Sequence, residues 1–151
     1  HGVIEQVGTP QEIYAKPATA FVADFVGHMT FLDAVANGPG SVKVGDLEFA
    51  VSGGQAFSPG TAVRLAMRPE EVRIRSITED TPNRFEARIG EMSFLGAFCR
   101  AALHPVQAPQ SAIVADFSAN AMRDLNLTTG DVRPVVFPAE ALRVYPREAA
   151  A

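Results

Sequence analysis

The spacing of hydrophobic residues divides the chain into two parts. Near the start, apolar residues recur at intervals of one, three and four positions, which places them on one face of an α-helix: Phe21, Val22, Phe25 and Val26. After Gly27, apolar positions instead alternate with polar ones, the pattern of β-strands that bury one face. The pattern therefore predicts a short helical segment followed by a mainly β domain.

The helical segment has a well-defined start and an interruption. Thr9 can cap a helix through its hydroxyl, Pro10 suits the first helical position, and Glu12 can accept a hydrogen bond from the cap amide. Pro17 disfavours the helical conformation in the residue before it, so the helix should bend or break there and then resume. Because its apolar face needs a partner, we expect residues 1–27 either to fold back on the β domain or to be poorly ordered, two outcomes that limited proteolysis separates.

The β part consists of short alternating stretches separated by turns. Hydrophobic and charged residues alternate in residues 63–68 and again in residues 84–89. Gly-rich and Pro-rich turns recur at short intervals: Asn37-Gly38-Pro39-Gly40, Gly45-Asp46, Ser52-Gly53-Gly54, Ser58-Pro59-Gly60 and Gly130-Asp131. Many short strands of this kind favour a closed or sandwich-like fold, since closure removes exposed strand edges. We expect a small β-barrel.

The β part also contains an internal repeat. Residues 60–74 and 130–144 each begin with a turn glycine, run through a Val-Arg pair into an apolar strand, and reach a proline followed two residues later by a glutamate. Proline ends a strand because it lacks an amide donor, and one helical turn can follow before the next strand leaves at a new angle. We therefore expect two related β-modules, residues 28–80 and 84–146, which share strands or pack closely, and a tail at residues 147–151.

Composition narrows the function classes. A chain of 151 residues that is 47% hydrophobic can bury a sizeable core. The net charge is −4 and the arginines are interleaved with carboxylates. The sequence therefore lacks the continuous basic stripe that would indicate nucleic-acid binding. No apolar run approaches the roughly 20 residues that cross a bilayer. The single cysteine, Cys99, excludes a disulfide framework within the chain and a CxxC motif.

The sequence holds no convincing catalytic constellation. The phosphate-binding pattern GxxxxGK[ST] is absent, so we expect neither ATP binding nor enzymatic activity from this chain itself. Its histidines lack metal-ligand spacing, and adjacent carboxylates on a strand point to opposite faces. These residues are His1, His28 and His104, and the pairs Glu70-Glu71 and Glu79-Asp80. We expect no cofactor and no metal site.

Residues 2–27, GVIEQVGTPQEIYAKPATAFVADFVG, resemble a specific family segment. They resemble the segment after the nucleotide-binding domain in ATP-binding subunits of bacterial ABC importers, in the spermidine/putrescine, ferric-iron and maltose-type branch. The linker helix motif comprises Gly8, Thr9, Pro10, Glu12, Ile13 and Tyr14. Further on, LAMRPE at residues 65–70 is similar to that family's LRPE motif, and Phe94-Leu95-Gly96 is similar to a turn in its second module.

The resemblance implies the C-terminal regulatory domain of such a subunit, called TOBE. The implied fold is a tandem of small OB-fold-like β-barrels behind a short helical linker. The implied parent hydrolyses ATP with Mg²⁺ at the cytoplasmic face of the inner membrane and drives solute import through a permease. Its implied partners are the nucleotide-binding domain of the same polypeptide, a second copy of the subunit and the permease subunits, but not nucleic acid.

The resemblance also suggests candidate interface or regulatory residues. They are the corner residues Arg68, Pro69 and Glu70 and the turn residues Phe94, Leu95 and Gly96. The competing interpretation is that Arg68 and Glu70 only cap the corner. A second functional reading is a small-oxyanion-binding β-barrel of the molybdate-binding type, in which Ser93, Thr128 and Thr129 would contact the anion.

Overall fold

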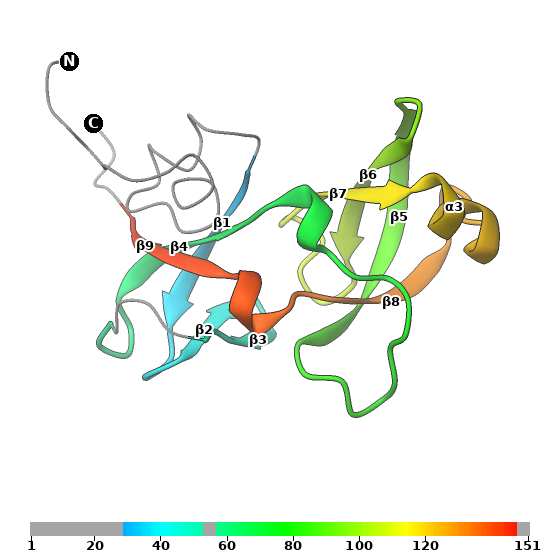
Figure 1. Cartoon of the computed structure of the whole chain (residues 1–151). Coiled ribbons are helices and arrows are strands. Elements are labelled where there is room, and N and C mark those ends of the chain that lie inside the picture. Colours follow the sequence, from blue (N-terminus) through cyan, green and yellow to red (C-terminus); the bar gives the residue numbers. More distant parts are fainter. Residues whose placement is uncertain (1–28, 53–56, 148–151) are drawn as a thin grey trace, which may run out of the picture.

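The computed structural model describes residues 29–52 and 57–147 (Figure 1). The predicted helical segment at residues 1–27, with its capping motif, lies outside the described residues, as do four of the five tail residues. Within the described part the fold is mainly β, as predicted, and its sheets form barrel-like OB-type folds.

The first sheet contains five antiparallel strands in the order β3-β2-β1-β4-β9. Their bounds are β1 Thr30–Ala36, β2 Ser41–Val44, β3 Leu47–Ala50, β4 Ala62–Met67 and β9 Arg143–Pro146. Strand β4 pairs with β1 on one side and with the edge strand β9 on the other, so that Leu65 lies opposite Leu32 and Val144. The last strand of the chain therefore completes a sheet whose other strands lie near its beginning.

The second sheet contains four antiparallel strands in the order β7-β6-β5-β8. Their bounds are β5 Arg84–Phe94, β6 Phe98–Pro105, β7 Ile113–Ser118 and β8 Val132–Val136. The pairing of β5 with β6 shifts between Ile89 and Met92, a β-bulge that bends the long strand. The β5–β6 hairpin projects from the body of the molecule (Figure 1).

The predicted alternation explains which strand faces are buried. On β4, Val63, Leu65 and Met67 join the core while Arg64 stays exposed between them. On β5, Phe85, Ala87 and Ile89 are buried in the same way. The predicted alternation is therefore confirmed on β5. On β4 it holds only as far as Leu65, because Ala66 packs with Met29 and Tyr145 in a second cluster and Arg68 is also buried, at 5% exposed.

The two copies of the internal repeat have the same local structure. Gly60 and Gly130 have φ angles of +90° and +97°, which favour glycine. After strands β4 and β8, each copy makes a single 3₁₀ turn, η1 at Pro69–Glu71 and η2 at Ala139–Ala141. The predicted strand and proline corner are therefore confirmed in both copies, but an outgoing strand forms only in the second copy, as β9, whereas after η1 the chain makes a single β-bridge at Arg73.

Each corner passes the chain to the sheet of the other copy. After η1, Arg73 forms a two-way backbone bridge with Val136 of β8, with N–O distances of 3.0 and 2.9 Å. After η2, β9 pairs with β4 of the first sheet. Residues 84–146, predicted as the second module, therefore contribute one strand to the sheet of residues 28–80.

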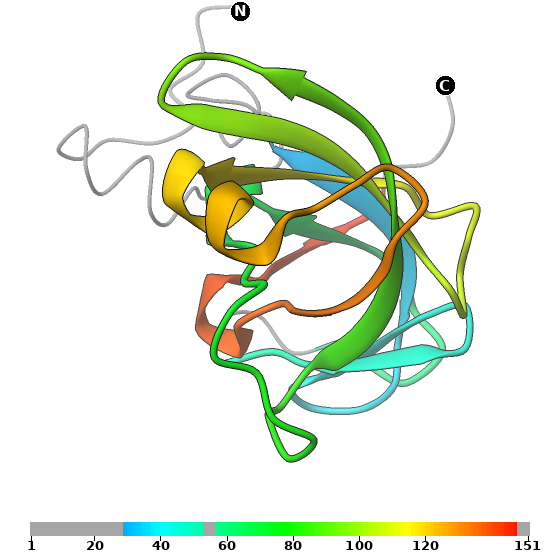
Figure 2. The ribbon, with the colours of Figure 1, turned by 90° about the vertical axis from the view of Figure 1, so that its right-hand side faces the viewer.

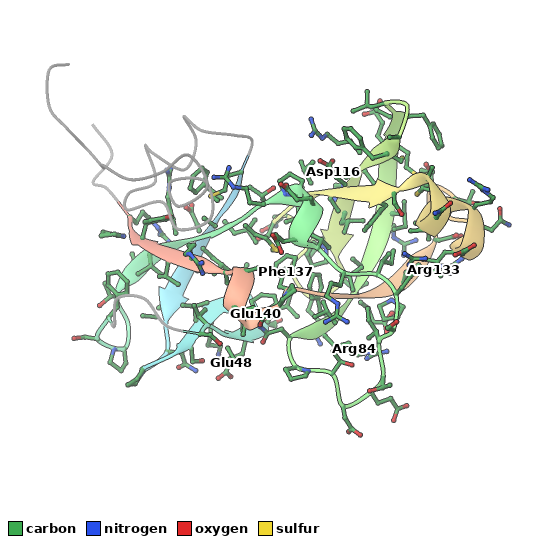
Figure 3. The ribbon with its side chains drawn as sticks, in the orientation of Figure 1. Glu48, Arg84, Asp116, Arg133, Phe137 and Glu140 are labelled. Atoms are coloured by element: carbon green, nitrogen blue, oxygen red, sulfur yellow. The ribbon has the colours of Figure 1, made fainter. Side chains whose placement is uncertain are left out.

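The main hydrophobic cluster contains buried residues of both sheets, and a small second cluster, Met29, Ala66 and Tyr145, packs separately. At the centre of the main cluster three phenylalanine rings meet, Phe49 from β3, Phe85 from β5 and Phe137 from the end of β8, with centroid distances of 4.8 to 5.6 Å. Figure 2 shows the strands curving around this interior, and Figure 3 labels Phe137 where the chain passes from β8 toward η2. Both sheets thus depend on one core.

One short helix was not predicted. Helix α3, Ala119–Leu125, follows β7 directly. The Ser118 hydroxyl oxygen caps it by accepting a hydrogen bond from the Ala121 amide at 3.1 Å, and Asn126, with φ +50°, ends it in the left-handed region. A serine followed by seven good or neutral helix formers was the signal in the sequence.

Candidate functional site

A groove of about 560 Å³ opens between the η1 corner and strands β6 and β7. Because η1 belongs to the β4 repeat and the strands belong to the second sheet, the groove lies where the two halves of the fold meet (Figure 1). Its walls combine apolar and charged side chains: Pro69, Glu70, Ala97, Phe98, Arg100, Asp116, Phe117 and Ser118. A volume of this size suits a small molecule or a protruding segment of a protein.

A bidentate ion pair forms the polar part of the groove. Arg100 and Asp116 lie opposite each other on β6 and β7. The Arg100 Nε donates to Asp116 Oδ1 at 2.8 Å, and a terminal nitrogen donates to Oδ2 at 3.0 Å. Only 13% of the Asp116 side chain is exposed, so the guanidinium satisfies a carboxylate that is largely removed from water (Figure 3).

The surroundings of Arg100 hold it in the charged form. Its hydrogen bond to Asp116 raises the pKa of the guanidinium above its ordinary value, and the negative charges of Asp116 and Glu70 add to this. Its guanidinium carbon also lies 5.7 Å from the ring centroid of Phe98, two residues earlier on β6, within the range of a cation–π contact. The guanidinium of Arg100 therefore interacts both with the Asp116 carboxylate and with the Phe98 ring.

Two of the three predicted corner residues lie at one wall of this groove. Pro69 is buried and borders the groove, and Glu70 is exposed beside it. Arg68 is only 5% exposed and precedes η1 in an extended conformation, and its side chain does not cap that turn. Within the predicted corner, Pro69 and Glu70 are the residues that reach the groove.

The predicted turn forms the tip of the β5–β6 hairpin. The side chains of Phe94 and Leu95 are 73% and 48% exposed, and Gly96 has a φ of +89°. The Leu95 amide closes the turn by donating to the Phe98 carbonyl at 2.9 Å. The next two residues, Ala97 and Phe98, line the groove, whereas Phe94, Leu95 and Gly96 themselves do not.

Six groove residues were not predicted from the sequence: Ala97, Phe98, Arg100, Asp116, Phe117 and Ser118. Arginine and aspartate sixteen positions apart carry no local signal, because they become neighbours only in the register of β6 against β7. Their alternation with buried residues on each strand was visible, but the register was not.

Two of the three predicted oxyanion residues, Thr128 and Thr129, bind other protein groups. The Thr129 hydroxyl donates to the Gly90 carbonyl at 3.0 Å, and the Thr128 amide donates to a carboxylate oxygen of Asp131 at 3.1 Å. Ser93 lies opposite Arg100 on the hairpin. A carboxylate at the Thr128 amide already occupies the place of an anion and repels a second one.

The single cysteine is a core residue. Cys99 on β6 is 1% exposed, and burial raises the pKa of its thiol. A neutral, buried thiol is a poor nucleophile. Among residues 29–52 and 57–147, no three His, Cys, Asp or Glu side chains gather where they could hold a metal ion. In the same part of the chain, no helix has the length and apolar character to span a membrane.

Two antiparallel sheets on a shared core, with a groove at their junction, define a small β-barrel domain. The TOBE domain family model matches residues 65–144, which run from β4 through both corners to β9. The chain belongs to the TOBE domain family.

Named relatives agree with this assignment. The sulfate/thiosulfate import ATP-binding protein CysA 2 of Chromobacterium violaceum is 36% identical over 99% of this chain. The Fe(3+) ions import ATP-binding protein FbpC 2 of Rhizobium meliloti is 36% identical over 95% of it. The spermidine/putrescine import ATP-binding protein PotA of Nitratidesulfovibrio vulgaris is 38% identical over 64%. The chain spans 40%, 39% and 28% of these proteins, respectively.

A solved structure shares the fold. The cytoplasmic molybdate-binding protein ModG, with molybdate bound, superposes with a TM-score of 0.62 over 87% of this chain and 99% of that one, at 11% sequence identity. At that identity the likeness shows the fold alone. The predicted fold class and the predicted family are thus both confirmed.

Proposed function

We propose that this chain is the C-terminal regulatory and dimerisation domain of the ATP-binding subunit of a bacterial ABC importer. The observation that carries the proposal is the extent of the similarity. Two proteins named as import ATP-binding proteins match nearly the whole chain, which makes up about two fifths of each. A domain that matches end to end within longer proteins of one kind is best explained as the same part of such a protein.

Under this proposal, ATP hydrolysis takes place in another domain and not in the residues of this chain. The nucleotide-binding domain of the same polypeptide would bind ATP and Mg²⁺ and hydrolyse ATP at the cytoplasmic face of the inner membrane, while permease subunits carry the solute. The present residues do not fit ATP, since the chain contains no GxxxxGK[ST] loop. We therefore assign no catalytic step to it.

The role of the domain would be to hold two subunits together. The candidate surface is the groove with its rim, formed by the Pro69-Glu70 corner and the Phe94-Leu95-Gly96 turn. A lasting contact between two barrels keeps their nucleotide-binding domains at high effective concentration after these separate. A ligand or regulatory protein that bound one arrangement better would shift the balance between open and closed forms.

The test uses the natural polypeptide that contains this chain. It should hydrolyse ATP when purified with its permease partners, and replacing the lysine of its phosphate-binding loop should abolish hydrolysis. The matched control is a charge reversal at Glu79, an exposed residue away from the groove, which should leave hydrolysis unchanged. A natural polypeptide without a nucleotide-binding domain would overturn the proposal.

Oxyanion binding is the second candidate, and the fold shared with ModG is what favours it. It ranks lower because Thr128 and Thr129 already bind protein groups and Asp131 brings a negative charge to the same place. A thermal-shift series with molybdate, phosphate and a phosphonate tests it, since a ligand that binds only the native state raises the melting temperature. An unchanged melting temperature at millimolar anion would remove this candidate.

A further inference from the structure

One end of the outer face of the first sheet is buried although it points away from the main core. On β4, Leu65 and Met67 belong to the main cluster, so Ala66 between them lies on the opposite, outer face. Ala66 is nevertheless 0% exposed, and it forms the second cluster with Met29 and Tyr145, both 6% exposed. The outer face of an antiparallel sheet commonly meets water. This part of it has a cover instead.

The burial of the outer face increases toward the end at which the chain enters the sheet. Along β1, Val35 is 43% exposed and the side chain of Asp33 is 73% exposed, whereas Met29, just before the strand, is buried. The antiparallel β4 shows the same trend, from exposed Ala62 to buried Ala66. The cover therefore lies at the Met29 end of the face.

The position of Tyr145 shows that the strands of the sheet do not provide this cover by themselves. Tyr145 lies on the outer face of β9, the edge strand, which pairs with β4. Strand pairing leaves both faces of a strand open, yet Tyr145 is almost fully buried, and burial raises the pKa of its hydroxyl. Within the described residues, no element of the second sheet packs extensively against β4 or β9. Groups from another part of the chain therefore cover this face.

Two of the three stretches outside the described ranges are unsuited to this role. Residues 53–56 and 148–151 read Gly-Gly-Gln-Ala and Glu-Ala-Ala-Ala, so neither carries a large apolar side chain. The tail also leaves the sheet at its exposed end, where the Arg147 amide donates to the Ala62 carbonyl at 3.4 Å. This elimination leaves residues 1–28.

Residues 1–28 meet the requirements of the cover. They join the sheet directly at Met29, at the buried end of the outer face. They also carry the predicted apolar stripe: Phe21, Val22, Phe25 and Val26. Val26 stands three positions before Met29, a span of at most about 11 Å, and Gly27 allows the chain to reverse between them. The stripe is therefore tethered within reach of the second cluster.

We propose that the apolar stripe of residues 21–26 packs on the outer face of the first sheet, over Met29, Ala66 and Tyr145. Ala66 lies opposite the partly buried Phe31 of β1, and a small side chain beside a ring leaves a shallow seat for one large apolar side chain. The inference does not depend on the proposed function. If both hold, the contact couples the barrel mechanically to the nucleotide-binding domain that precedes it.

Two alanines on the same face of β4 supply a matched test in the natural polypeptide. Ala66→Glu puts a carboxylate into the contact, whereas Ala62→Glu puts one at the exposed end of the same face. Chymotrypsin should cleave after Phe21 or Phe25 at least about tenfold faster in Ala66→Glu than in the wild type, because a buried charge releases the segment. Cleavage of Ala62→Glu should be unchanged. Equal rates in the three proteins, or rapid cleavage of the wild type, would overturn the proposal.

Alkylation of Cys99 separates release of the segment from unfolding of the domain. The Cys99 thiol is 1% exposed, and it should stay unreactive in both glutamate variants while the protease acts on residues 21–25. If Ala66→Glu makes Cys99 reactive, that variant has unfolded, and the proposal is decided by substitutions within the segment.

These substitutions probe the same contact from its other side. Phe25→Ser shortens the apolar stripe, and Asp24→Ser, next to it but outside the stripe, is the control. Acetylation of the Tyr145 hydroxyl by N-acetylimidazole, followed by mass spectrometry, should be at least about fivefold faster in Phe25→Ser and unchanged in Asp24→Ser, because loss of the cover exposes the hydroxyl. Equal Tyr145 reactivity in the wild type and both variants would mean that the stripe packs elsewhere, and the proposal fails. ATP hydrolysis by the same preparations reports separately on the proposed function.

Discussion

The side-chain amide of Asn83 binds both backbone polar groups of Ala50. Its Oδ1 accepts from the Ala50 amide at 2.8 Å, and its Nδ2 donates to the Ala50 carbonyl at 2.8 Å. Nδ2 also donates to the Phe137 carbonyl at 2.8 Å. The side chain thus acts as an extra strand residue that joins the end of β3 to the start of β5 and the end of β8, at the place where the two sheets meet.

Replacing Asn83 should therefore destabilise the whole domain. Asn83→Ala removes three hydrogen bonds and puts alanine at a φ of +61°, so we expect a loss of about 2–3 kcal/mol in the free energy of unfolding. Urea unfolding measures it. Asn37→Ala, which removes an exposed hydrogen bond to Glu48, is the control and should cost no more than about 0.5 kcal/mol. Equal losses in the two variants would show that Asn83 does not join the sheets.

The Arg100–Asp116 pair should show measurable coupling. A double-mutant cycle with Arg100→Ala and Asp116→Ala should give a coupling energy of about 1 kcal/mol, because the pair is bidentate and one partner is largely buried. The control is a cycle on Arg75 and Asp124, an ion pair of 3.1 Å whose side chains are 49% and 63% exposed, for which we expect about 0.3 kcal/mol. A larger coupling in the exposed pair would contradict this account of the groove.

A side chain at position 90 should collide with His104. A Cβ on Gly90 would lie 2.8 Å from His104 Nε2 and 3.2 Å from the Ala102 carbonyl oxygen. Gly90→Ala should cost about 1–3 kcal/mol, the range of overpacking. The second substitution His104→Ala should recover part of that loss, since it removes the side-chain contact but not the backbone one. Thermal unfolding of the two single variants and the double variant checks this, and strict additivity would argue against the contact.

The buried thiol should make stability depend on alkaline pH. Burial raises the pKa of Cys99 in the folded state, so above about pH 8.5 the unfolded chain loses a proton that the folded chain retains. The unfolded state then binds fewer protons than the native state, and the free energy of unfolding falls as pH rises through this window. In the Cys99→Ala variant, whose side chain cannot ionise, the free energy of unfolding should fall less steeply between pH 8 and 10. If urea unfolding gives parallel plots of the free energy of unfolding against pH for the two proteins, the thiol does not contribute to the pH dependence.

Much of the fold could be predicted because its causes are local. Alternation identified the buried faces of β4 and β5, and proline after an apolar strand identified both corners. Helix α3 was missed although Ser118 offered a cap. The helix has only seven residues and follows β7 directly, so its sequence resembles a continuation of that strand. The pairing of β9 with β4 depends on contacts across the core and has no local signal.

The candidate site divides in the same way. Pro69, Glu70 and the Phe94-Leu95-Gly96 turn could be named in advance because they resemble motifs of the family, and proline after an apolar strand also marks a corner in its own right. Arg100 and Asp116 could not, since only the register of two strands brings them together. The interface role of these residues remains a prediction, as does the oxyanion role of Ser93, Thr128 and Thr129.

The crossing of the two corners has a consequence for biosynthesis. While the ribosome has released only the residues up to Arg73, the first sheet still lacks the strand β9 that binds its free edge, and Arg73 lacks its partner Val136. An unpaired strand edge invites association with other chains. The edge of β4 thus stays unpaired until almost the last residue described here has left the exit tunnel. A stop codon ahead of Arg143 would therefore leave a chain prone to aggregate and not a shorter folded domain.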